Sequence, residues 1–385
     1  MSAPLAAAPL ATPAARRARA RVLELGRTGR ADAAFLAELA RWLRVLIPYH
    51  TAVWSAVDPL TGLATAPTRL EAPDLGALLG QCESYWEREF LEPDVLHYRD
   101  LARAGRPAGA LFRATGDLPA RSARYRALRA ALGLGDELRG VFRSEATVWG
   151  LVSLWREGGR SAFSPAEERL LADLAAPLAA AFRRAARCPP GAAGSATAPA
   201  PGVLLLDPGG ALEAFNGPGA AWLDELQPPA AAAAPSALLT VAARARVVAA
   251  GRERGDARAL LQGRSGRWLV VHGSCLSGAP GAPTGDRVAL VIKPAPAATL
   301  APRIAEAYEL APRELEVTQQ LARGRSTAEI ATDLCLSPHT VRDYVKRVLQ
   351  KVGASSRGEL VATLFATRAL PPLQLAAHPA GAATG

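Results

Sequence analysis

Lysine is nearly absent from this chain of 385 residues. Of its 45 arginines and lysines, only Lys293, Lys346 and Lys351 are lysines. A phosphorylatable receiver domain needs a lysine at the end of a strand, beside a cluster of acidic residues. Because no lysine precedes Lys293, the sequence excludes such a domain over most of its length.

The common catalytic signatures are also missing. The sequence has no G-x-x-x-x-G-K-[ST] phosphate loop, no G-x-S-x-G nucleophile turn and no H-E-x-x-H metal motif. Its five histidines are scattered, at His50, His97, His272, His339 and His378. We therefore expect no enzyme activity, no metal and no cofactor.

Cysteines and long apolar runs are scarce as well. The four cysteines, Cys82, Cys188, Cys275 and Cys335, lie far apart and form no C-x-x-C pair, which favours reduced thiols. No apolar run approaches the roughly 20 residues that span a bilayer. The N-terminal arginines follow the first apolar run, the reverse of a secretory signal. The sequence predicts a cytoplasmic protein without membrane contact.

Apolar residues and arginine, by contrast, are abundant. Half of the residues are apolar, so we expect several folded domains, and the formal net charge of +10 favours an acidic partner. Changes in composition divide the chain into six parts. They are a disordered basic arm (1–29), a first α+β domain (30–186), a Pro/Ala/Gly linker (187–201), a second α+β domain (202–296), an all-α domain (300–370) and a disordered tail (371–385).

The first α+β domain is predicted from its order of elements. "AAFLAELARWLRVLI" has apolar residues at helical spacing, and strand-like segments such as "TAVWSAV", "DELRGVF" and "ATVWGLVSLWRE" follow. Ser164 and Glu167 are spaced as a capping box, with Pro165 at the first helical position, so a long helix begins there. This order predicts an antiparallel sheet with a closing helix, and it resembles a GAF sensory domain.

The second α+β domain opens with "GVLLLDPGGALEAFN", two strand-like segments joined by a turn. Helical segments follow, and then the strands "RALLQG", "RWLVVHGSCL" and "RVALVIK", with a long hairpin loop expected at 276–286. The opening resembles that of a PAS domain. A small α+β domain without a ligand is the alternative.

The C-terminal part is predicted to be wholly helical. Ser326 with Glu329 and Ser356 with Glu359 are spaced as capping boxes, and Ser337 precedes Pro338 at the start of another helix. "CLS" is the short turn before that helix. Two helices joined by a tight turn, the second with a basic outer face, are the helix-turn-helix pattern of DNA recognition.

This part also resembles a known family. "APRELEV" and "ARGRSTAEIATDLCLSPHTVRDYVKRVLQKVGASSRGELV" are similar to the LuxR/GerE-type DNA-binding domain over about 65 residues. There are two departures from the family pattern. Ala311 stands where a threonine usually caps the first helix, and Tyr344 stands where histidine is common.

The resemblance implies that the helix after "CLS" enters the major groove. Arg342, Asp343 and Lys346 then fall at positions that reach base edges, while Thr340, Arg347 and Lys351 lie nearer the phosphates. Ser337 and His339 complete the expected set. Arg342 and Lys346 are one helical turn apart, and Arg or Lys to guanine is the commonest specific pairing. Asp343 either accepts from cytosine or only orients Arg347, and for an isolated helix such a face is ordinarily just solvated.

The sequence therefore predicts a DNA-binding transcription regulator with two sensor-like α+β domains, GAF-like and PAS-like. Expected partners are double-stranded DNA, RNA polymerase and an unknown small-molecule or protein ligand. The resemblance also implies a homodimer that pairs through its fourth helix, at Leu360, Val361, Leu364 and Phe365. The alternatives are an enzyme tethered to a DNA-binding tail, and a protein-interaction scaffold with such a tail and no small-molecule ligand.

Overall fold

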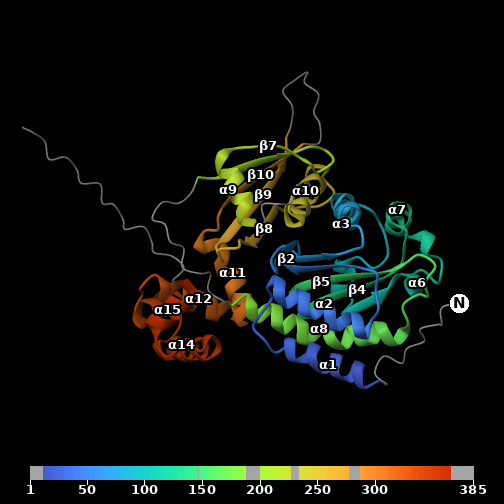
Figure 1. Cartoon of the computed structure of the whole chain (residues 1–385). Coiled ribbons are helices and arrows are strands. Elements are labelled where there is room, and N and C mark those ends of the chain that lie inside the picture. The colour runs from blue at the N-terminus through green and yellow to red at the C-terminus, as the bar shows by residue number, and fades with distance from the viewer. Residues whose placement is uncertain (1–11, 146, 188–199, 227–233, 277–286, 366–385) are drawn as a thin grey trace, which may run out of the picture. The chain divides into compact units, whose positions relative to one another are not determined.

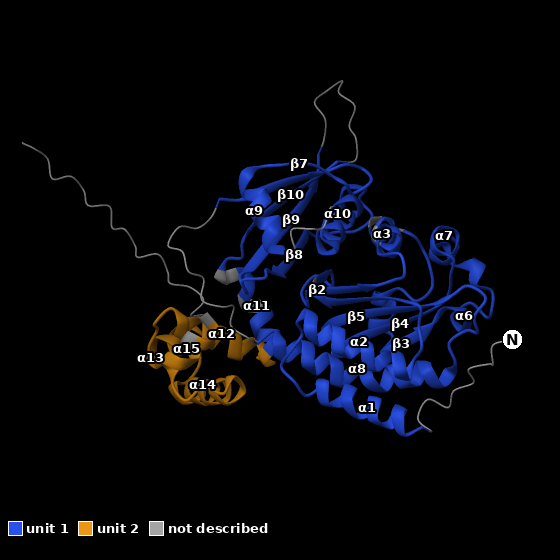
Figure 2. Cartoon of the chain, in the orientation of Figure 1, with its two compact units in different colours: residues 1–307 blue, residues 308–385 orange. Residues whose placement is uncertain are grey.

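Figure 1 shows the computed structural model of the chain, which describes residues 12–145, 147–187, 200–226, 234–276 and 287–365. The fold divides into two compact units, unit 1 at residues 1–307 and unit 2 at residues 308–385 (Figure 2). The expected tail, most of the expected linker and the hairpin loop lie outside the described residues.

Unit 1 opens with helices and a first sheet. Its helices up to residue 187 are α1 (Pro13–Leu25), α2 (Ala33–Leu46), α3 (Leu75–Leu79), α4 (Cys82–Leu91), α5 (Tyr98–Arg103), α6 (Leu111–Ala114), the short η1 (Pro119–Arg121), α7 (Ala123–Leu132) and α8 (Pro165–Ala185). The strands of the first sheet are β1 (Thr51–Val57), β2 (Ala64–Glu71), β3 (Ala108–Ala110), β4 (Leu134–Ser144) and β5 (Thr147–Glu157).

The first sheet is antiparallel, in the order β2-β1-β5-β4-β3. Because side chains alternate along a strand, the sheet has two different faces. One face carries apolar residues such as Trp54, Leu138 and Val152, which share a core with apolar residues of α2 and α8. On the opposite face, Arg139 of β4 and Ser153 of β5 lie in register. Helix α8 contacts β3, β4 and β5, and the short helices α5, α6 and α7 contact β4.

A second sheet in unit 1 has the same strand order as the first. Its strands β6 (Gly202–Leu206), β7 (Leu212–Phe215), β8 (Ala257–Gln262), β9 (Trp268–Cys275) and β10 (Val288–Pro294) are arranged β7-β6-β10-β9-β8. Helix α10 (Ser236–Ala249) packs on β8, β9 and β10, and it also packs against α4 of the first region. Helix α9 (Gly217–Leu226) contacts β6.

Unit 2 is helical. Helix α11 (Ala297–Tyr308) leads into it, and its own helices are α12 (Pro312–Ala322), α13 (Thr327–Asp333), α14 (Pro338–Val352) and α15 (Arg357–Phe365). The expected arrangement of two α+β regions followed by a helical C-terminal region is therefore confirmed. The GAF-like and PAS-like subtypes stay predictions.

The expected disordered basic arm is wrong for residues 13–25, which form α1. Thr12 caps this helix, Pro13 occupies its first turn, and Ala18 and Val22 are fully buried among α2 and α8. Between the arginines, Ala15, Ala18, Val22 and Leu25 recur at helical spacing and form an apolar face. This face packs into the core, which the arginine-rich composition alone does not indicate. The remaining arm, residues 1–11, lies outside the described residues.

No helix in the part of the chain that the structure describes is long and apolar enough to cross a membrane. The described residues also contain no group of three or more His, Cys, Asp or Glu side chains placed to hold a metal ion.

Candidate nucleic-acid interface and a buried ionic cluster

The helix-turn-helix of unit 2 is built from two capped helices and the four residues between them, 334–337. The Ser326 hydroxyl accepts from the Glu329 N–H at the start of α13, and the Glu329 carboxylate accepts from the Ser326 N–H, so the expected capping box is present. In the turn, Cys335 adopts a φ of 54°, a left-handed conformation that costs a residue with a Cβ energy. Ser337 then caps α14 by accepting from the Thr340 N–H at 3.0 Å.

Helix α14 has a buried side and an exposed side. Val341 and Val348 are fully buried and Val345 nearly so, and the helix contacts α12, α13 and α15. On the opposite side Arg342 and Lys346 are exposed, one turn apart. The valines therefore fix the helix in the unit while the basic side chains remain available to a partner.

Four other predicted residues lie close to this exposed side, at the N-terminal half of α14. The Ser337 and Thr340 hydroxyls are 2.8 Å apart and hydrogen-bonded. His339 Nδ1 lies 3.2 Å from an Asp343 carboxylate oxygen, and both side chains are mostly exposed. Asp343 therefore faces His339 rather than Arg347, which the sequence offered as its partner.

The side chain of Arg347 packs against other residues of α14. Its guanidinium lies 4.5 Å from the ring centre of Tyr344, and its Nε donates to the Asp343 carbonyl at 3.4 Å. The tyrosine found where the family often has histidine thus supports an arginine of the same helix.

Lys351 is exposed, but its amino group is hydrogen-bonded to other residues of unit 2. Its Nζ donates to the Glu314 carboxylate and to the Glu309 carbonyl, both at 2.6 Å. Burial would raise the pKa of Glu314, but the hydrogen bonds from Lys351 and the Ala311 N–H outweigh it and lower the pKa. Lys351 therefore joins the end of α14 to the start of α12, and its part in contacting phosphate stays a prediction.

An open groove of about 420 Å³ runs beside α14 and brings the basic residues together with one that the sequence analysis missed. Val345 and Leu349 contribute its apolar lining, and Arg342, Lys346 and Arg357 its charge. Arg357, at the first turn of α15, also donates to the Thr327 hydroxyl at 2.6 Å. The Ser-Ser-Arg sequence before the fourth helix is the signal that could have found it.

The expected pairing surface on the fourth helix needs correction. Leu360 and Leu364 are 0% and 3% exposed, because α15 packs against α12 and α14. Val361 is partly exposed, and the Phe365 side chain lies outside the described ones. The two leucines therefore belong to the core of unit 2 and offer no surface to a second chain.

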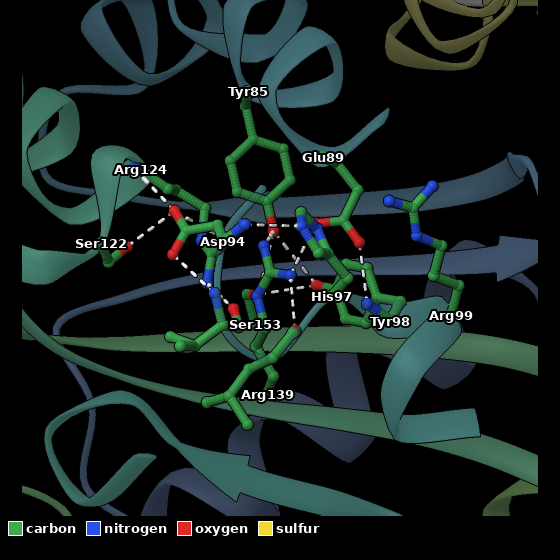
Figure 3. Close-up of polar contacts among 12 residues, drawn as sticks. Tyr85, Glu89, Asp94, His97, Tyr98, Arg99, Ser122, Arg124, Arg139 and Ser153 are labelled. Carbon is green, nitrogen blue, oxygen red and sulfur yellow. Dashed lines mark hydrogen bonds and ion pairs between the residues drawn. The ribbon is translucent and has the colours of Figure 1, made fainter. Parts of the chain in front are cut away.

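A cluster of buried charges lies in unit 1, under the helices that cover the polar face of the first sheet (Figure 3). Arg139 of β4 is fully buried and donates to Glu137 at 2.8 Å, to Glu89 of α4 at 2.6 Å and to the Tyr85 hydroxyl. Its guanidinium lies 4.3 Å from the Tyr98 ring centre. This cluster was not predicted.

A second arginine completes the cluster. Arg124 of α7 donates to Glu137 at 2.9 Å and lies 3.7 Å from Asp94. Although burial would raise the pKa of Glu89, Arg139 and its other neighbours lower it to about 2. The same two arginines lower the pKa of Glu137 against the effect of burial. These charges therefore compensate one another inside the protein.

The edge of the cluster consists of three hydroxyl groups and one histidine. The hydroxyls of Tyr85, Tyr98 and Ser153 form hydrogen bonds with one another, and Ser153 also donates to Glu137 at 2.9 Å. His97 accepts from the Asp94 N–H at Nε2 and lies with Nδ1 3.5 Å from Glu89. The only sequence signal was the alternation of Glu137 and Arg139, two residues apart on one face of a strand.

Comparison with known proteins places unit 2. Residues 308–364 match the family described as bacterial regulatory proteins, luxR family. The spore germination protein GerE of Bacillus subtilis is 38% identical over 56 residues, which cover 14% of this chain and 76% of GerE. The probable transcriptional regulatory protein NarL of Mycobacterium tuberculosis is 39% identical over 61 residues, or 16% of this chain. The match spans only 28% of NarL's own length.

Among solved structures, the phage VqmA–DPO complex covers 43% of this chain and 83% of its own, at 19% identity. Its TM-score of 0.19 is too low to establish a common fold. The family match falls on the helices that form the helix-turn-helix. The chain belongs, through unit 2, to the luxR family of bacterial regulatory proteins.

Proposed function

We propose that the chain is a transcription regulator that binds duplex DNA sequence-specifically through α14. The observation that carries the proposal is the division of α14 into a buried valine side and an exposed side with Arg342 and Lys346 one turn apart. Arginine and lysine side chains on a helix in the major groove can donate to guanine O6 and N7. No enzyme activity is part of the proposal.

In this proposal the exposed residues of unit 2 have different roles. Arg342 and Lys346 read base edges, and Asp343 accepts from a cytosine amino group once it leaves His339. Arg347 and Arg357 contact phosphates on the two sides of the groove, with Ser337, His339 and Thr340 near the start of α14. Lys351 holds α14 to α12 and approaches phosphate only by leaving Glu314.

The proposal gives unit 1 the role of a sensor for a small molecule or a protein partner. What supports this role is the buried cluster of Arg124, Arg139 and their carboxylates, because such ionic groups are costly to bury and tend to lie at functional sites. The chain acts as a homodimer on a pseudo-palindromic site and contacts RNA polymerase.

The test replaces Lys346 by alanine in the full chain. DNA fragments selected from a genomic pool by the wild-type protein serve as the probe. If Lys346 reads a base, Lys346→Ala lowers affinity for the selected site by about 1–3 kcal/mol, roughly 5- to 150-fold, and relaxes sequence preference at one position. Fluorescence anisotropy at fixed ionic strength measures the affinity, and sequencing of the selected pool measures the preference.

Arg313→Ala is the matched control. Arg313 lies on α12 and is paired with Glu316, so its replacement removes one positive charge from the same unit without touching α14. It should leave the sequence preference unchanged. Selected sequences and affinities that are the same for Lys346→Ala and the wild type would refute the assignment of α14 as the reading helix.

A further inference from the structure

A narrow cavity lies on the polar face of the first sheet, beside the buried ionic cluster. Trp155 of β5 and Leu70 of β2 line it from the sheet, and Tyr85 and Trp86 of α4 line it from the helix side. The space that can take the centre of a water molecule is only about 20 Å³, enough for about one water. The cavity is therefore a slit bounded by aromatic rings.

The chemistry of the walls is neutral throughout. No acidic or basic side chain lines the slit, and its polar lining residues are Ser55, Thr68, Gln81, Cys82, Tyr85 and Ser236. The nearby charges of Arg139, Glu137 and Glu89 are paired with one another behind Tyr85. A charged ligand would therefore find no counter-charge in the slit.

Trp155 adds a hydrogen-bond donor that the described protein atoms do not use. The side chain is 2% exposed, and its buried Nε1–H has no hydrogen-bond partner in the described structure. A buried donor without an acceptor is unfavourable, so a ligand that supplies an acceptor binds more tightly than one that does not. The ring packs edge-on to Tyr85, with centroids 6.1 Å apart.

We propose that this slit is the closed form of the sensory site of unit 1, and that it widens to take a small, uncharged, planar molecule carrying a hydrogen-bond acceptor. The aromatic walls set the planar shape, the neutral lining excludes ions, and the Trp155 N–H selects the acceptor. The inference rests on the proposed sensor role of unit 1 and names the class of ligand for it.

Two connections link the slit to the rest of unit 1. Tyr85 lines it and accepts from Arg139 with its hydroxyl, so a ligand that moves this ring disturbs the ionic cluster. Ser236, at the start of α10, lines it from the second sheet region. Widening the slit therefore moves Tyr85, which packs on the first sheet, and Ser236, which begins the helix that packs on the second sheet.

The test uses three probes of nearly the same shape on the full chain. Acetophenone is neutral and has a carbonyl acceptor, α-methylstyrene replaces that carbonyl by a methylene group, and benzoate carries a negative charge. Ligand-observed NMR titrations measure the three affinities. Acetophenone should bind about fivefold more tightly than α-methylstyrene, the factor given by one hydrogen bond of about 1 kcal/mol, and benzoate should not bind.

The variant Trp155→Phe keeps an aromatic wall and removes the N–H, so the preference for acetophenone over α-methylstyrene should disappear. Trp149→Phe is the matched control. Trp149 is also buried with an unpaired Nε1–H, but it does not line the slit, so its replacement should keep the preference.

Cys82 supplies a second readout that needs no variant. It lines the slit, and burial raises the pKa of its thiol to about 11, so alkylation of this residue is slow and depends on access. With acetophenone at about twice its dissociation constant, alkylation of Cys82 by iodoacetamide should slow about threefold, as followed by peptide mass spectrometry.

The proposal is overturned if none of the probes binds the folded wild-type chain, which would leave the slit as a packing gap for one water. It is also overturned if benzoate binds as well as acetophenone, or if Trp155→Phe keeps the preference. Each of these results leaves the DNA measurements on Lys346 unaffected. Failure of the ligand site and failure of the DNA-binding proposal are therefore distinguishable.

Discussion

Ala311 begins α12 without a side chain that can cap it. Its backbone has the extended conformation of a capping residue, with φ −63° and ψ 155°. Glu314 supplies half of a capping box by accepting from the Ala311 N–H at 2.8 Å. The Glu314 N–H, which would donate to a capping hydroxyl, has no acceptor on the alanine side chain.

Ala311→Ser should therefore stabilise α12 by about 1 kcal/mol, because a serine hydroxyl in this conformation can accept from the Glu314 N–H. Native-state hydrogen exchange of α12 in the full chain measures the gain as slower exchange. Ser326→Ala is the opposite change in the same unit, since it removes an existing cap, and exchange in α13 should become faster. Unchanged exchange in α12 of Ala311→Ser would contradict the capping argument.

At the scale of single elements, β4 carries a fully buried arginine between two strands. Arg139 compensates Glu137 on its own strand and Glu89 on α4, 50 residues earlier in the chain. Removing one partner of a buried ionic group leaves the other charges uncompensated, at a cost of about 3–5 kcal/mol. Strand β4 therefore stabilises unit 1 in two ways, through its backbone hydrogen bonds to β3 and β5 and through the ion pairs of Arg139.

Arg139→Met should lower the free energy of unfolding of the full chain by about 3–5 kcal/mol at pH 7. In the wild type Glu89 has a lowered pKa of about 2, so its contribution is fully present above about pH 4.5 and is lost as the pH falls toward 2. In the variant burial is no longer opposed by Arg139 and raises the carboxyl pKa values. The variant should thus regain stability between pH 7 and 5, where the wild type changes little.

Urea unfolding followed by tryptophan fluorescence at the two pH values measures this difference. Arg113→Met is the control, because Arg113 pairs with Glu168 at an exposed position and should contribute less than about 1 kcal/mol. An Arg139→Met variant that loses the same stability at both pH values would show that the buried charges are not coupled as the contacts indicate.

These elements also show what the sequence can and cannot predict. Ser164 and Ser326 mark helix starts through interactions within four residues, so α8 and α13 were predicted with their caps. The short helices α4, α5 and α6 have no side-chain cap, and α5 and α6 are held by contacts with β4. Asp74 and Ser122 do cap α3 and α7, but these helices are too short to show an apolar repeat. The partnership of Glu89 with Arg139 depends on how distant segments fold together, and no spacing in the sequence records it.

In unit 2, the exposed side of α14 could be predicted from the sequence because it lies within one helix. Its contacts with DNA stay a prediction. Arg342 and Lys346 share a face through the helical repeat alone. Burial of Leu360 depends instead on how α15 packs against α12, and the paired state of Lys351 depends on Glu314, 37 residues away. Residues whose roles arise from such packing are the ones that the sequence placed wrongly or left open.

At the scale of the molecule, Asp58 joins the two sheet regions of unit 1. It follows β1, and its carboxylate accepts from the Leu260 N–H of β8 at 3.1 Å. Arg303 of α11 lies 3.9 Å from the same carboxylate and 4.4 Å from the Trp268 ring centre. Burial lowers the pKa of Arg303 to about 10, although Asp58 opposes the shift. One buried acid thus connects both sheets with α11.

Asp58→Ala should uncouple the two sheet regions, so that unit 1 unfolds in two calorimetric transitions instead of one cooperative transition. The control is Arg99→Ala, which breaks the exposed Arg99–Glu253 pair that also joins the two regions, and which should keep a single transition. A single transition in Asp58→Ala, at a merely lower temperature, would show that packing of α10 on α4 is sufficient for cooperativity.

Because unit 2 has so few lysines, a reagent that modifies amines can label it at a single favoured position. Its only lysines are Lys346, which is exposed on the outer side of α14, and Lys351, which is tied to Glu314. An acylating reagent that attacks free amines therefore meets one favoured target in this unit, at the centre of the proposed DNA contact. The chain carries a built-in footprinting site, whose acylation would report occupancy of α14 without any engineered label.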